Sequence, residues 1–553
     1  MGSQVQARVL PPGFDQTKFD ESLDALAAIV GPDNISRDSS LGNLEGPAGE
    51  SCYGDVWPIG NDESTDHTPS GAVRPKTVEE VQEVVKVASQ YGLPVWTVSR
   101  GKNLGYGGSG GVVRGSVVLD LHRMNKIIEV SEEHAYAIVE PGVSFLELYA
   151  YIREKGYKLW PSCPALGWGS IVGNTLERGF GYTPNGEHSE QQCGMEVVLA
   201  TGEVVRTGMG ALTDSPMWPL FKGGFGPSID GLFFQSNLGI VTKIGIHMMA
   251  APAAYADCVV SVPNQDQLSA MIRVIAHLER EGIIQNHTSV SNPYRRSLSE
   301  LQTKPDLVPR VLGPGMQGGC ASNKDMTALA NEQGWGYWTG NFGVYAASTA
   351  ILDAQLDLVQ ERIRQAIPHA KVTATRHYAG PGQRLDASTL PITEIPHTGV
   401  PGIHNAAVMN LRGPGGGHLS FSPLFPTDGV DLQVWFDRVL PFTEESGFDL
   451  FCDFHVYGRY VIGIILVIYM PATEGERVKK LFERLLEDAE RNGISEYRTH
   501  INYMDRVRSQ FDFGDNALGR MLSSIKGLLD PSGILSQGKS GIWSEPSAAK
   551  AAA

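Results

Sequence analysis

Three glycine-rich segments constrain this chain more than any other feature: residues 99–111 (SRGKNLGYGGSGG), 166–186 and 223–245. Glycine tolerates positive φ and lets backbone amides approach a ligand closely, as a phosphate-binding loop requires. Any one segment could be an ordinary turn, but that interpretation does not easily cover all three. A dinucleotide-binding G-x-G-x-x-G loop would open a helix, whereas the first segment is followed by the strand pattern SVVLDL (116–121). The sequence therefore predicts a large cofactor held between several loops.

Length and charge narrow the class of protein. A chain of 553 residues is too long for one core, which predicts two or three domains. The formal net charge of −16, without a basic block, argues against nucleic acid and anionic membranes as partners. A neutral or phenolic small molecule stays compatible with this charge.

Targeting signals and cysteines favour a cytoplasmic protein, with a peroxisomal location not excluded. The N-terminus lacks an apolar signal segment. The most apolar stretch, VIGIILVIYM (461–470), is too short to cross a bilayer as a helix, and its pattern predicts a buried strand. No C-x-x-C pair occurs, so neither a metal site nor a disulfide framework is predicted from the scattered Cys52, Cys163, Cys193, Cys258, Cys320 and Cys452.

The first half alternates strand and helix patterns. Thr77 with Glu80, and Ser144 with Glu147, have the spacing of capping boxes that open two helices. The segment EVVLATGEVVRTG predicts a hairpin that turns at Thr201-Gly202. These elements indicate a mixed α+β domain that ends near residue 265.

A second region begins with a predicted helix over 267–282. It continues with a helix over 352–367, a long strand near 455–470 and a helix opened by Thr473 with Glu476. Helices beside long strands predict an antiparallel sheet with helical cover. The final segment holds a helix over 517–531, and the tail SEPSAAKAAA carries little information.

Nine short motifs then occur in order: WTVSRGKNLGYGG, VVLDL, VEPGV, GSIVGNTLERGFGYTP, GMEVVLATGEVVRTGMGAL, QSNLGIVTKIGI, HLSFSPLFP, EYRTH and GKSGIW. Together they resemble the flavoprotein family of vanillyl-alcohol oxidase, eugenol oxidase and p-cresol methylhydroxylase, over roughly residues 70–545. The resemblance implies an α+β, two-domain flavoprotein. Its FAD-binding domain would span 1–265 and be completed by a C-terminal segment, 501–553, with a substrate-binding cap domain over 266–500.

The same resemblance implies FAD as the cofactor, with its pyrophosphate on the backbone amides of Gly101 to Gly105. The residues that it assigns to FAD are Ser99, Arg100, Gly101, Lys102, Asn103, Leu104, Gly105, Tyr106, Gly108, Pro164, Leu166, Gly169, Ser170, Gly173, Asn174, Glu177, Gly179, Tyr182, Gly239, Ile240, Val241, His418, Arg498 and Lys539.

A phenol-binding trio is implied by two of the motifs. Tyr106 in NLGYGG and Tyr497-Arg498 in EYRTH match the residues that hold the phenol oxygen in the family. Two tyrosine hydroxyls and a guanidinium around one oxygen favour its anion. A phenolate is a better hydride donor at its para-benzylic carbon than a phenol. Arg498 could also face the flavin N1–C2=O edge. Taken alone, a Tyr-Arg pair would more simply be an ion-pair residue beside a core aromatic.

His418, after three glycines in GPGGGHLSFSP, matches the histidine that is covalently attached to the flavin in oxidases of the family. A histidine here favours the oxidase branch and a covalent flavin, although some relatives bind FAD without a bond.

One departure from the family concerns an acid. Oxidases of the family carry an aspartate beside flavin N5, where this chain has Ala165 in LWPSCPALGWGS, with Ser162 at the earlier acidic position. Asp453 in GFDLFCDFHVYG stands where vanillyl-alcohol oxidase has threonine. We treat a catalytic Asp453 and a paired structural Asp453 as equal alternatives.

These residues predict oxidation of para-substituted phenols through a p-quinone methide, with O2 reduced to hydrogen peroxide. The alternatives are a cytochrome-linked dehydrogenase of the same fold, an oxidase of sugars or hydroxy acids, and a non-catalytic flavin-binding homologue. The family also suggests a homodimer or larger homo-oligomer.

Overall fold

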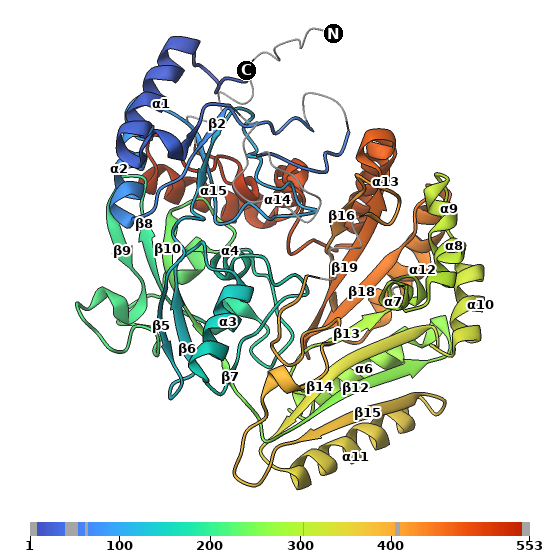
Figure 1. Cartoon of the computed structure of the whole chain (residues 1–553). Helices are drawn as coiled ribbons and strands as arrows, with labels where there is room; N and C mark the ends of the chain where they lie inside the picture. Colours follow the sequence, from blue (N-terminus) through green and yellow to red (C-terminus); the bar gives the residue numbers. More distant parts are fainter. Residues whose placement is uncertain (1–7, 39–52, 61–64, 302, 404–409, 545–553) are drawn as a thin grey trace.

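The computed structural model describes residues 8–38, 53–60, 65–301, 303–403 and 410–544. Figure 1 shows two bodies of secondary structure: small sheets from the first half of the chain, and one long sheet from the second half. Cys52 and the tail after Ser544 lie outside the described residues.

The first sheet has the strand order β1 (Ile35–Ser36), β2 (Gly71–Val73), β4 (Val117–Asp120) and β3 (Val95–Val98), and its last three strands are parallel. It packs with α1 (Gln16–Val30) and α2 (Val78–Tyr91) in one apolar core. The Thr77 side chain accepts a hydrogen bond from the Glu80 amide, which confirms the predicted start of α2. The Glu80 carboxylate accepts instead from the Lys76 amide, at 2.6 Å, so this capping box is displaced by one residue.

The second sheet is antiparallel, in the order β5 (Ile127–Ser131), β6 (Tyr136–Val139), β10 (Ile240–His247), β8 (Gln192–Val198) and β9 (Val204–Arg206). The predicted hairpin is confirmed, because Val198 pairs with Val204. The helix α3 (Phe145–Lys155) packs here behind a complete capping box between Ser144 and Glu147. A two-stranded sheet, β7 (Leu159–Trp160) with β11 (Met249–Ala250), lies at the end of this region.

The long sheet is antiparallel throughout, as the sequence predicts. Its order is β15 (Lys371–Tyr378), β12 (Ala254–Val262), β14 (Trp338–Ala346), β13 (Thr288–Ser291), β18 (Phe451–Val456), β19 (Tyr460–Tyr469) and β16 (Gly417–Phe421), with β17 (Leu424–Pro426) also on β19. The apolar stretch 461–470 is the buried β19, apart from its last residue. The strand β12 is part of this sheet, which favours a boundary between the two domains before Ala254. The predicted domain boundaries at residues 265 and 500 stay predictions.

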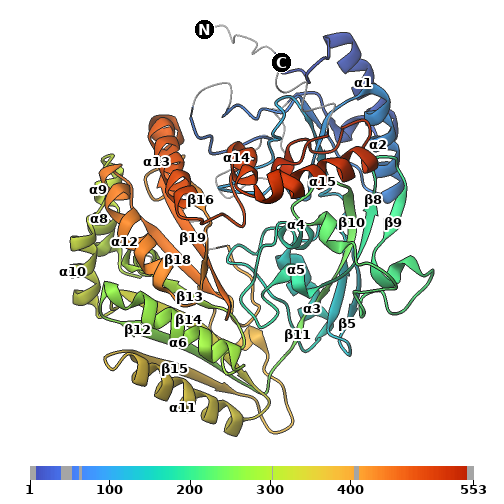
Figure 2. The same ribbon diagram turned by 180° about the vertical axis from the view of Figure 1, so that it is seen from behind.

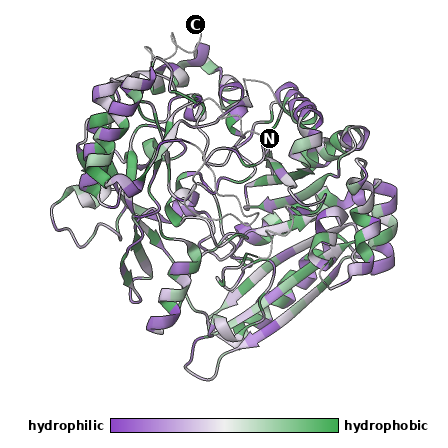
Figure 3. Cartoon of the chain, turned by 45° about the horizontal axis from the view of Figure 1, so that its top comes forward, coloured by the Kyte–Doolittle hydropathy of each residue, from purple (hydrophilic) through white to green (hydrophobic). Residues whose placement is uncertain are grey.

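Helices cover the long sheet: α6 (Leu268–Arg280), α11 (Thr349–Ala366), α12 (Val430–Glu445) and α13 (Pro471–Arg491). Figure 3 shows that these helices carry both hydrophilic and hydrophobic residues, as amphipathic helices do when one side meets a core. The predicted start of α13 at Thr473 is wrong. The helix begins at Pro471, a proline position typical of a first turn, and Glu474 accepts the Met470 amide at 2.7 Å.

The C-terminal segment returns to the first sheet. Figure 2 shows α15 (Phe513–Leu529) beside α2, with α14 (Met504–Ser509) at the end of α15 that is away from the N-terminal helices. The Val95 amide donates to Ile534 O at 2.9 Å, and the Ser536 amide donates to Val95 O at 2.8 Å. The chain end therefore extends the sheet that carries the first glycine segment.

A fully buried ion pair anchors this return. Lys526 Nζ lies 2.6 Å from Asp530 and donates to the backbone oxygens of Asn237 and Leu535, each at 2.7 Å. Lys526→Met would leave Asp530 buried without its cation, so we expect a loss of about 3–5 kcal/mol in the free energy of unfolding. A thermal melt would show this as a large fall in Tm. The control, Arg520→Met, breaks an exposed pair, and equal melts for both variants would contradict the anchor.

Among the described residues, no helix is both long enough and apolar enough to cross a membrane.

Candidate active site

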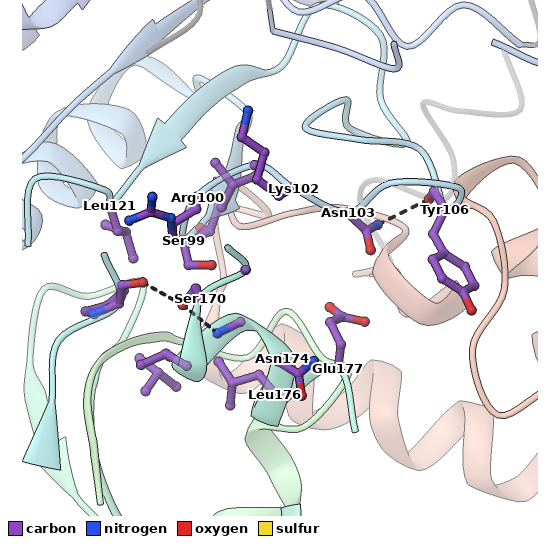
Figure 4. A pocket seen from close by; sticks show the side chains of 18 of the residues that line it. Ser99, Arg100, Lys102, Asn103, Tyr106, Leu121, Ser170, Asn174, Leu176 and Glu177 are labelled. Carbon is purple, nitrogen blue, oxygen red and sulfur yellow. Dashed lines mark hydrogen bonds between the residues drawn. The ribbon is translucent and has the colours of Figure 1, made fainter. Parts of the chain in front are cut away.

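A cavity of about 300 Å³ lies where the glycine segments meet. Its walls come from the β3–β4 loop, from α4 (Ile171–Leu176) and its approach, from the start of β10 and from the C-terminal segment. Figure 4 shows this cavity, with Asn103 and Tyr106 on one side and Ser170, Asn174 and Glu177 on the α4 side. Four stretches far apart in the sequence thus enclose one space.

Most of the residues predicted to bind FAD line this cavity. They are Ser99, Arg100, Gly101, Lys102, Asn103, Leu104, Tyr106, Gly108, Pro164, Leu166, Gly169, Ser170, Gly173, Asn174, Glu177, Gly239, Ile240, Val241, His418, Arg498 and Lys539.

Three predicted residues are not in this lining. Gly105 lies against His418, because a Cβ at Gly105 would come within 2.7 Å of the imidazole Nε2. Gly179 packs on Asn174, with 2.5 Å between its notional Cβ and the amide oxygen. Tyr182 is buried in a separate aromatic cluster, with its ring centroid 5.0 Å from that of His287.

The cavity is cationic although the chain is acidic. Arg100, Lys102, Arg498 and Lys539 line it, and among the residues that the structure describes Glu177 is the only carboxylate in the lining. The Glu177 carboxylate pairs with Lys539. Burial raises the pKa of Glu177, but the charges of Lys539 and Arg498 outweigh burial and hold that pKa below its usual value. The remaining positive charge suits an anionic ligand such as a pyrophosphate.

Buried polar atoms in the lining fit a ligand. Arg100 Nε, His418 Nδ1 and Arg498 Nε have no hydrogen-bond partner within the described part of the chain. Buried polar groups are normally paired. A flavin dinucleotide, which carries phosphate, ribose and ring heteroatoms, would supply partners along such a wall, so the residues present fit FAD.

The segment GILSQGKS (533–540) has the spacing of a P-loop, G-x-x-x-x-G-K-S. A P-loop joins a strand to the helix that follows it. Here the segment follows α15 and ends in a 3-10 helix over Lys539–Gly541. Lys539 pairs with Glu177, so the segment serves as a wall of this cavity and not as a nucleotide-binding P-loop.

Two of the three predicted phenol-binding residues, Tyr106 and Arg498, meet in the lining of the cavity, whereas Tyr497, next to Arg498 in the chain, lies outside that lining. Arg498 Cζ lies 4.2 Å from the centroid of the Tyr106 ring, and its guanidinium donates to the Asn103 side chain. Burial raises the pKa of Tyr497, and Arg498 opposes this shift through charge and a hydrogen bond. The Tyr106 hydroxyl is 2.8 Å from Ser422 Oγ.

Backbone hydrogen bonds hold this arrangement. The Ile501 amide donates to Tyr106 O and the Tyr497 amide donates to Ser422 O, both at 3.1 Å. Next to the trio, the Glu496 carboxyl accepts the Ser422 amide at 2.8 Å. Burial raises the pKa of Glu496 to about 8. Most of this carboxyl is therefore protonated at pH 7 and adds little negative charge beside Tyr497 and Arg498.

His418 lies on β16, between the first glycine segment and Trp57. The Trp57 and His418 ring centroids are 5.0 Å apart. Burial lowers the pKa of His418 to about 4, so its imidazole is neutral at pH 7. A neutral imidazole keeps the lone pair that a nucleophile needs.

Asp453 is a buried, paired residue of β18 and is not in the cavity lining. Ser289 and Ser291 donate to it, and Arg295 Nε lies 3.6 Å from its Oδ2. His455 Nε2 is 3.8 Å from the same oxygen. Ala165 is partly buried between Pro164 and Leu166, so the structure places no carboxylate at that position.

Sequence reasoning missed part of the lining. Gln235 and Asn237 lie in the QSNLG motif. Because this motif is part of the family resemblance, it could have pointed to both residues. Gln235 Nε2 donates to Tyr497 O at 2.8 Å, and Asn237 Nδ2 donates to Ser536 O at 3.0 Å, so this motif ties the trio and the chain end to the cavity. The other missed residues are Trp96, Thr97, Val98, Leu121, Pro141, Trp168, Val172, Leu176, Phe233, Ser236, Leu535 and Ser536.

Fold and site together define a flavoprotein whose cofactor cavity lies beside a long cap sheet. A sequence model described as an FAD binding domain matches residues 69–208. The chain is 32% identical to the 4-cresol dehydrogenase [hydroxylating] flavoprotein subunit of Pseudomonas putida, over 98% of this chain and 99% of the relative.

Two solved structures have the same fold. The 4-ethylphenol oxidase of Gulosibacter chungangensis, in an isoeugenol complex, has a TM-score of 0.85 and 31% identity, over 97% of this chain and 99% of that one. A p-cresol methylhydroxylase with substrate bound has a TM-score of 0.86 and 30% identity over the same shares. The chain belongs to the family of vanillyl-alcohol oxidase and p-cresol methylhydroxylase, and FAD is its cofactor.

Proposed function

We propose that this protein oxidises para-substituted phenols: 4-alkylphenols, eugenol-like phenols or vanillyl-alcohol-like substrates. The observation that carries the proposal is the Tyr106–Arg498 contact, with Tyr497 beside it, at the end of a cationic cavity that fits FAD. The names of three similar proteins, which concern 4-cresol, 4-ethylphenol and p-cresol, support this substrate class.

The residues of the chain would orient and polarise the substrate. Tyr106, Tyr497 and Arg498 bind the phenol oxygen and stabilise its anion, which raises the electron density at the para-benzylic carbon. FAD supplies the acceptor for the hydride that leaves this carbon. The p-quinone methide that remains takes up water to form an alcohol, or loses a proton to form an alkene; a benzylic alcohol goes on to the aldehyde.

A panel of 4-alkylphenols and vanillyl alcohol tests the function. Anaerobic addition of a true substrate should bleach the flavin absorbance within the dead time or a few seconds of mixing. A sugar or hydroxy acid that bleaches the flavin while every phenol fails would contradict the proposal. Failure of all compounds would instead favour a non-catalytic flavin-binding homologue.

We propose O2 as the electron acceptor, with a cytochrome as the second candidate. His418 in the cavity lining favours the oxidase, whereas the similarity to a dehydrogenase and to a methylhydroxylase favours the cytochrome. In air, an oxidase forms one H2O2 for each phenol oxidised, and a horseradish peroxidase assay measures this ratio. Turnover that requires an added cytochrome or dye, without peroxide, would identify the dehydrogenase. The phenol, O2 and a second copy of the chain are thus the proposed partners.

Asp453 is proposed to direct water onto the quinone methide from the face opposite to that used by relatives with an acid beside flavin N5, because this chain has Ala165 at the position of that acid. Asp453→Asn should then lower the enantiomeric excess of the alcohol formed from 4-ethylphenol, because the amide no longer accepts a proton from water. Chiral chromatography of the product measures this change. A racemic product from the unmodified enzyme, or an unchanged excess in the variant, would contradict the role.

A further inference from the structure

The long antiparallel sheet of the second half of the chain, called the cap sheet here, has one apolar face and one polar face. Side chains alternate along a strand, and the core takes Cys258, Val260, Phe342, Val290 and Phe454. The alternate positions face the other way. Their register pairs Val259 with Asn341, Ser289 with Asn341 and with His455, and Ser291 with Asp453. A mostly polar row therefore crosses four neighbouring strands from Val259 to His455, and Asp453 lies two residues before His455 on the last of them, opposite Ser291.

A second cavity, of about 290 Å³, lies over this row. Asp257, Asn341 and Ser291 line it from the sheet, Arg295 lines it from α7 (Pro293–Glu300), and the loop through 393–397 lines its remaining side. The cavity of the flavin site shares none of these residues.

His397 provides independent support for ordered water in this cavity. Its side chain is 1% exposed, and its Nδ1 is 2.9 Å from Asp257 Oδ1. Its Nε2 has no hydrogen-bond partner among the described residues, and His397 lines the cavity. A buried ring nitrogen in a polar cavity is a position that an ordered water normally satisfies.

One layer of side chains separates this cavity from Asp453. Ser291 Oγ donates to Asp453 Oδ1 at 3.3 Å, and Arg295 Nε lies 3.6 Å from Oδ2. Arg295 Nη1 also donates to Glu394 Oε1 at 2.7 Å. Ser291, Arg295 and Glu394 all line the cavity.

Asp453 also borders the aromatic cluster around Tyr182 through His455, whose Nε2 lies 3.8 Å from Asp453 Oδ2. The Tyr182 and His455 ring centroids are 5.9 Å apart. Burial raises the pKa of Tyr182, and the charges of Asp453 and Tyr497 add to that shift. Asp453 thus stands between the polar cavity and the residues next to the phenol-binding trio.

We propose that the polar cavity is the reservoir and entry path of the water that hydrates the quinone methide. This inference rests on the proposed function. Water that passes Ser291 and Arg295 reaches Asp453. Its oxygen forms the new bond to the benzylic carbon, and one of its protons passes to the Asp453 carboxylate. The electron pair of the exocyclic C=C bond moves to the ring oxygen, which becomes a phenolate at Tyr106, Tyr497 and Arg498.

The first test dries the cavity without touching the trio. Asn341→Leu replaces an amide with an apolar group of similar size, and Val259→Phe fills the space. With 4-ethylphenol, we expect the ratio of 1-(4-hydroxyphenyl)ethanol to 4-vinylphenol to fall by about three- to tenfold, the range of one lost hydrogen bond. The anaerobic rate of flavin reduction should stay the same, because hydride transfer precedes hydration.

Thr375→Leu is the matched control. Thr375 is exposed on β15, pairs with Asp257 in the sheet and is not in the cavity lining. Its product ratio should match that of the unmodified enzyme. An unchanged ratio in both cavity variants would overturn the proposal, whereas a flavin that no phenol reduces would refute the proposed function instead.

A second test needs no turnover. A high-resolution crystal structure of the holoenzyme should show ordered waters in the cavity, with one in hydrogen-bond distance of His397 Nε2 and a chain that reaches Arg295. Asn341→Leu should remove at least part of this chain. A dry cavity in the unmodified protein would overturn the proposal whatever the substrate.

Discussion

Arg498→Met should lower kcat/KM for 4-alkylphenols by about 10²–10³-fold, the usual loss when one preorganised donor to an anionic oxygen is removed. Arg498 is the cation of the proposed phenol site: it lies over the Tyr106 ring, and its charge opposes the rise that burial causes in the pKa of Tyr497. Methionine keeps much of the packing but removes the charge that favours phenolate. Stopped-flow measurement of flavin reduction against substrate concentration gives the rate and the apparent affinity separately.

Because Arg498 also lines the cofactor cavity, a second readout is needed. Phenol itself has no benzylic carbon and cannot be oxidised at that position, so its binding reports the oxygen site alone. The affinity for phenol, measured by calorimetry, should be lower in Arg498→Met than in the unmodified protein. In the unmodified protein this affinity should rise with pH, and in the variant it should not, because the variant stabilises less phenolate. FAD content, from absorbance, should stay near that of the unmodified protein.

Arg506→Met is the matched control. Arg506 forms an ion pair with Glu490 in which each side chain is about one-third exposed to solvent, and it lies outside the cavity lining. It should change kcat/KM little. A loss of less than tenfold in Arg498→Met, with full FAD content, would mean that the two tyrosines stabilise the phenolate without the guanidinium. Tyr106→Phe, which removes only a hydroxyl, would then be expected to show the larger effect.

The parts of the fold that local patterns determine could be predicted from the sequence. The capping boxes and the Thr201-Gly202 hairpin depend on residues within a few positions of each other, and the structure confirms their elements. The start of α13 was missed because two pairs of residues can each begin a helix here. Pro471 and Glu474 form the observed start, and Thr473 with Glu476 has an equally suitable spacing. Both patterns obey the same capping chemistry, and only the packed structure chooses between them.

The candidate site depends on contacts that no local pattern encodes. Tyr106 and Arg498 are 392 positions apart in the printed numbering, and their contact follows from sheet pairing and from the Ile501–Tyr106 backbone hydrogen bond. The sequence could suggest that contact only through the resemblance. Asp453 shows the limit: the sequence left a catalytic and a paired structural role open, and its partners Ser289, Ser291 and Arg295 come from other elements.

FAD in this protein should be covalently bound through His418, so acid precipitation should give a yellow pellet. His418→Ala should release all the flavin into the supernatant. His188→Gln is the matched control, because burial also lowers the pKa of His188 to about 4, yet His188 is not in the cavity lining. A colourless pellet from the unmodified protein would contradict attachment, and would suggest that the acid absent at Ala165 is needed for it.

The pH dependence of attachment tests the nucleophile itself. An ordinary histidine, with a pKa near 6.5, loses its lone pair to protonation as the pH falls through 6.5. Burial lowers the pKa of His418 to about 4, so the neutral imidazole persists down to about pH 5. If apoprotein is mixed with FAD, the rate of covalent attachment should therefore stay flat between pH 8 and about 5.5. A rate that halves near pH 6.5 would show that the imidazole titrates normally before FAD binds. Contact with Gly105 and Trp57 would then not shield the imidazole from water.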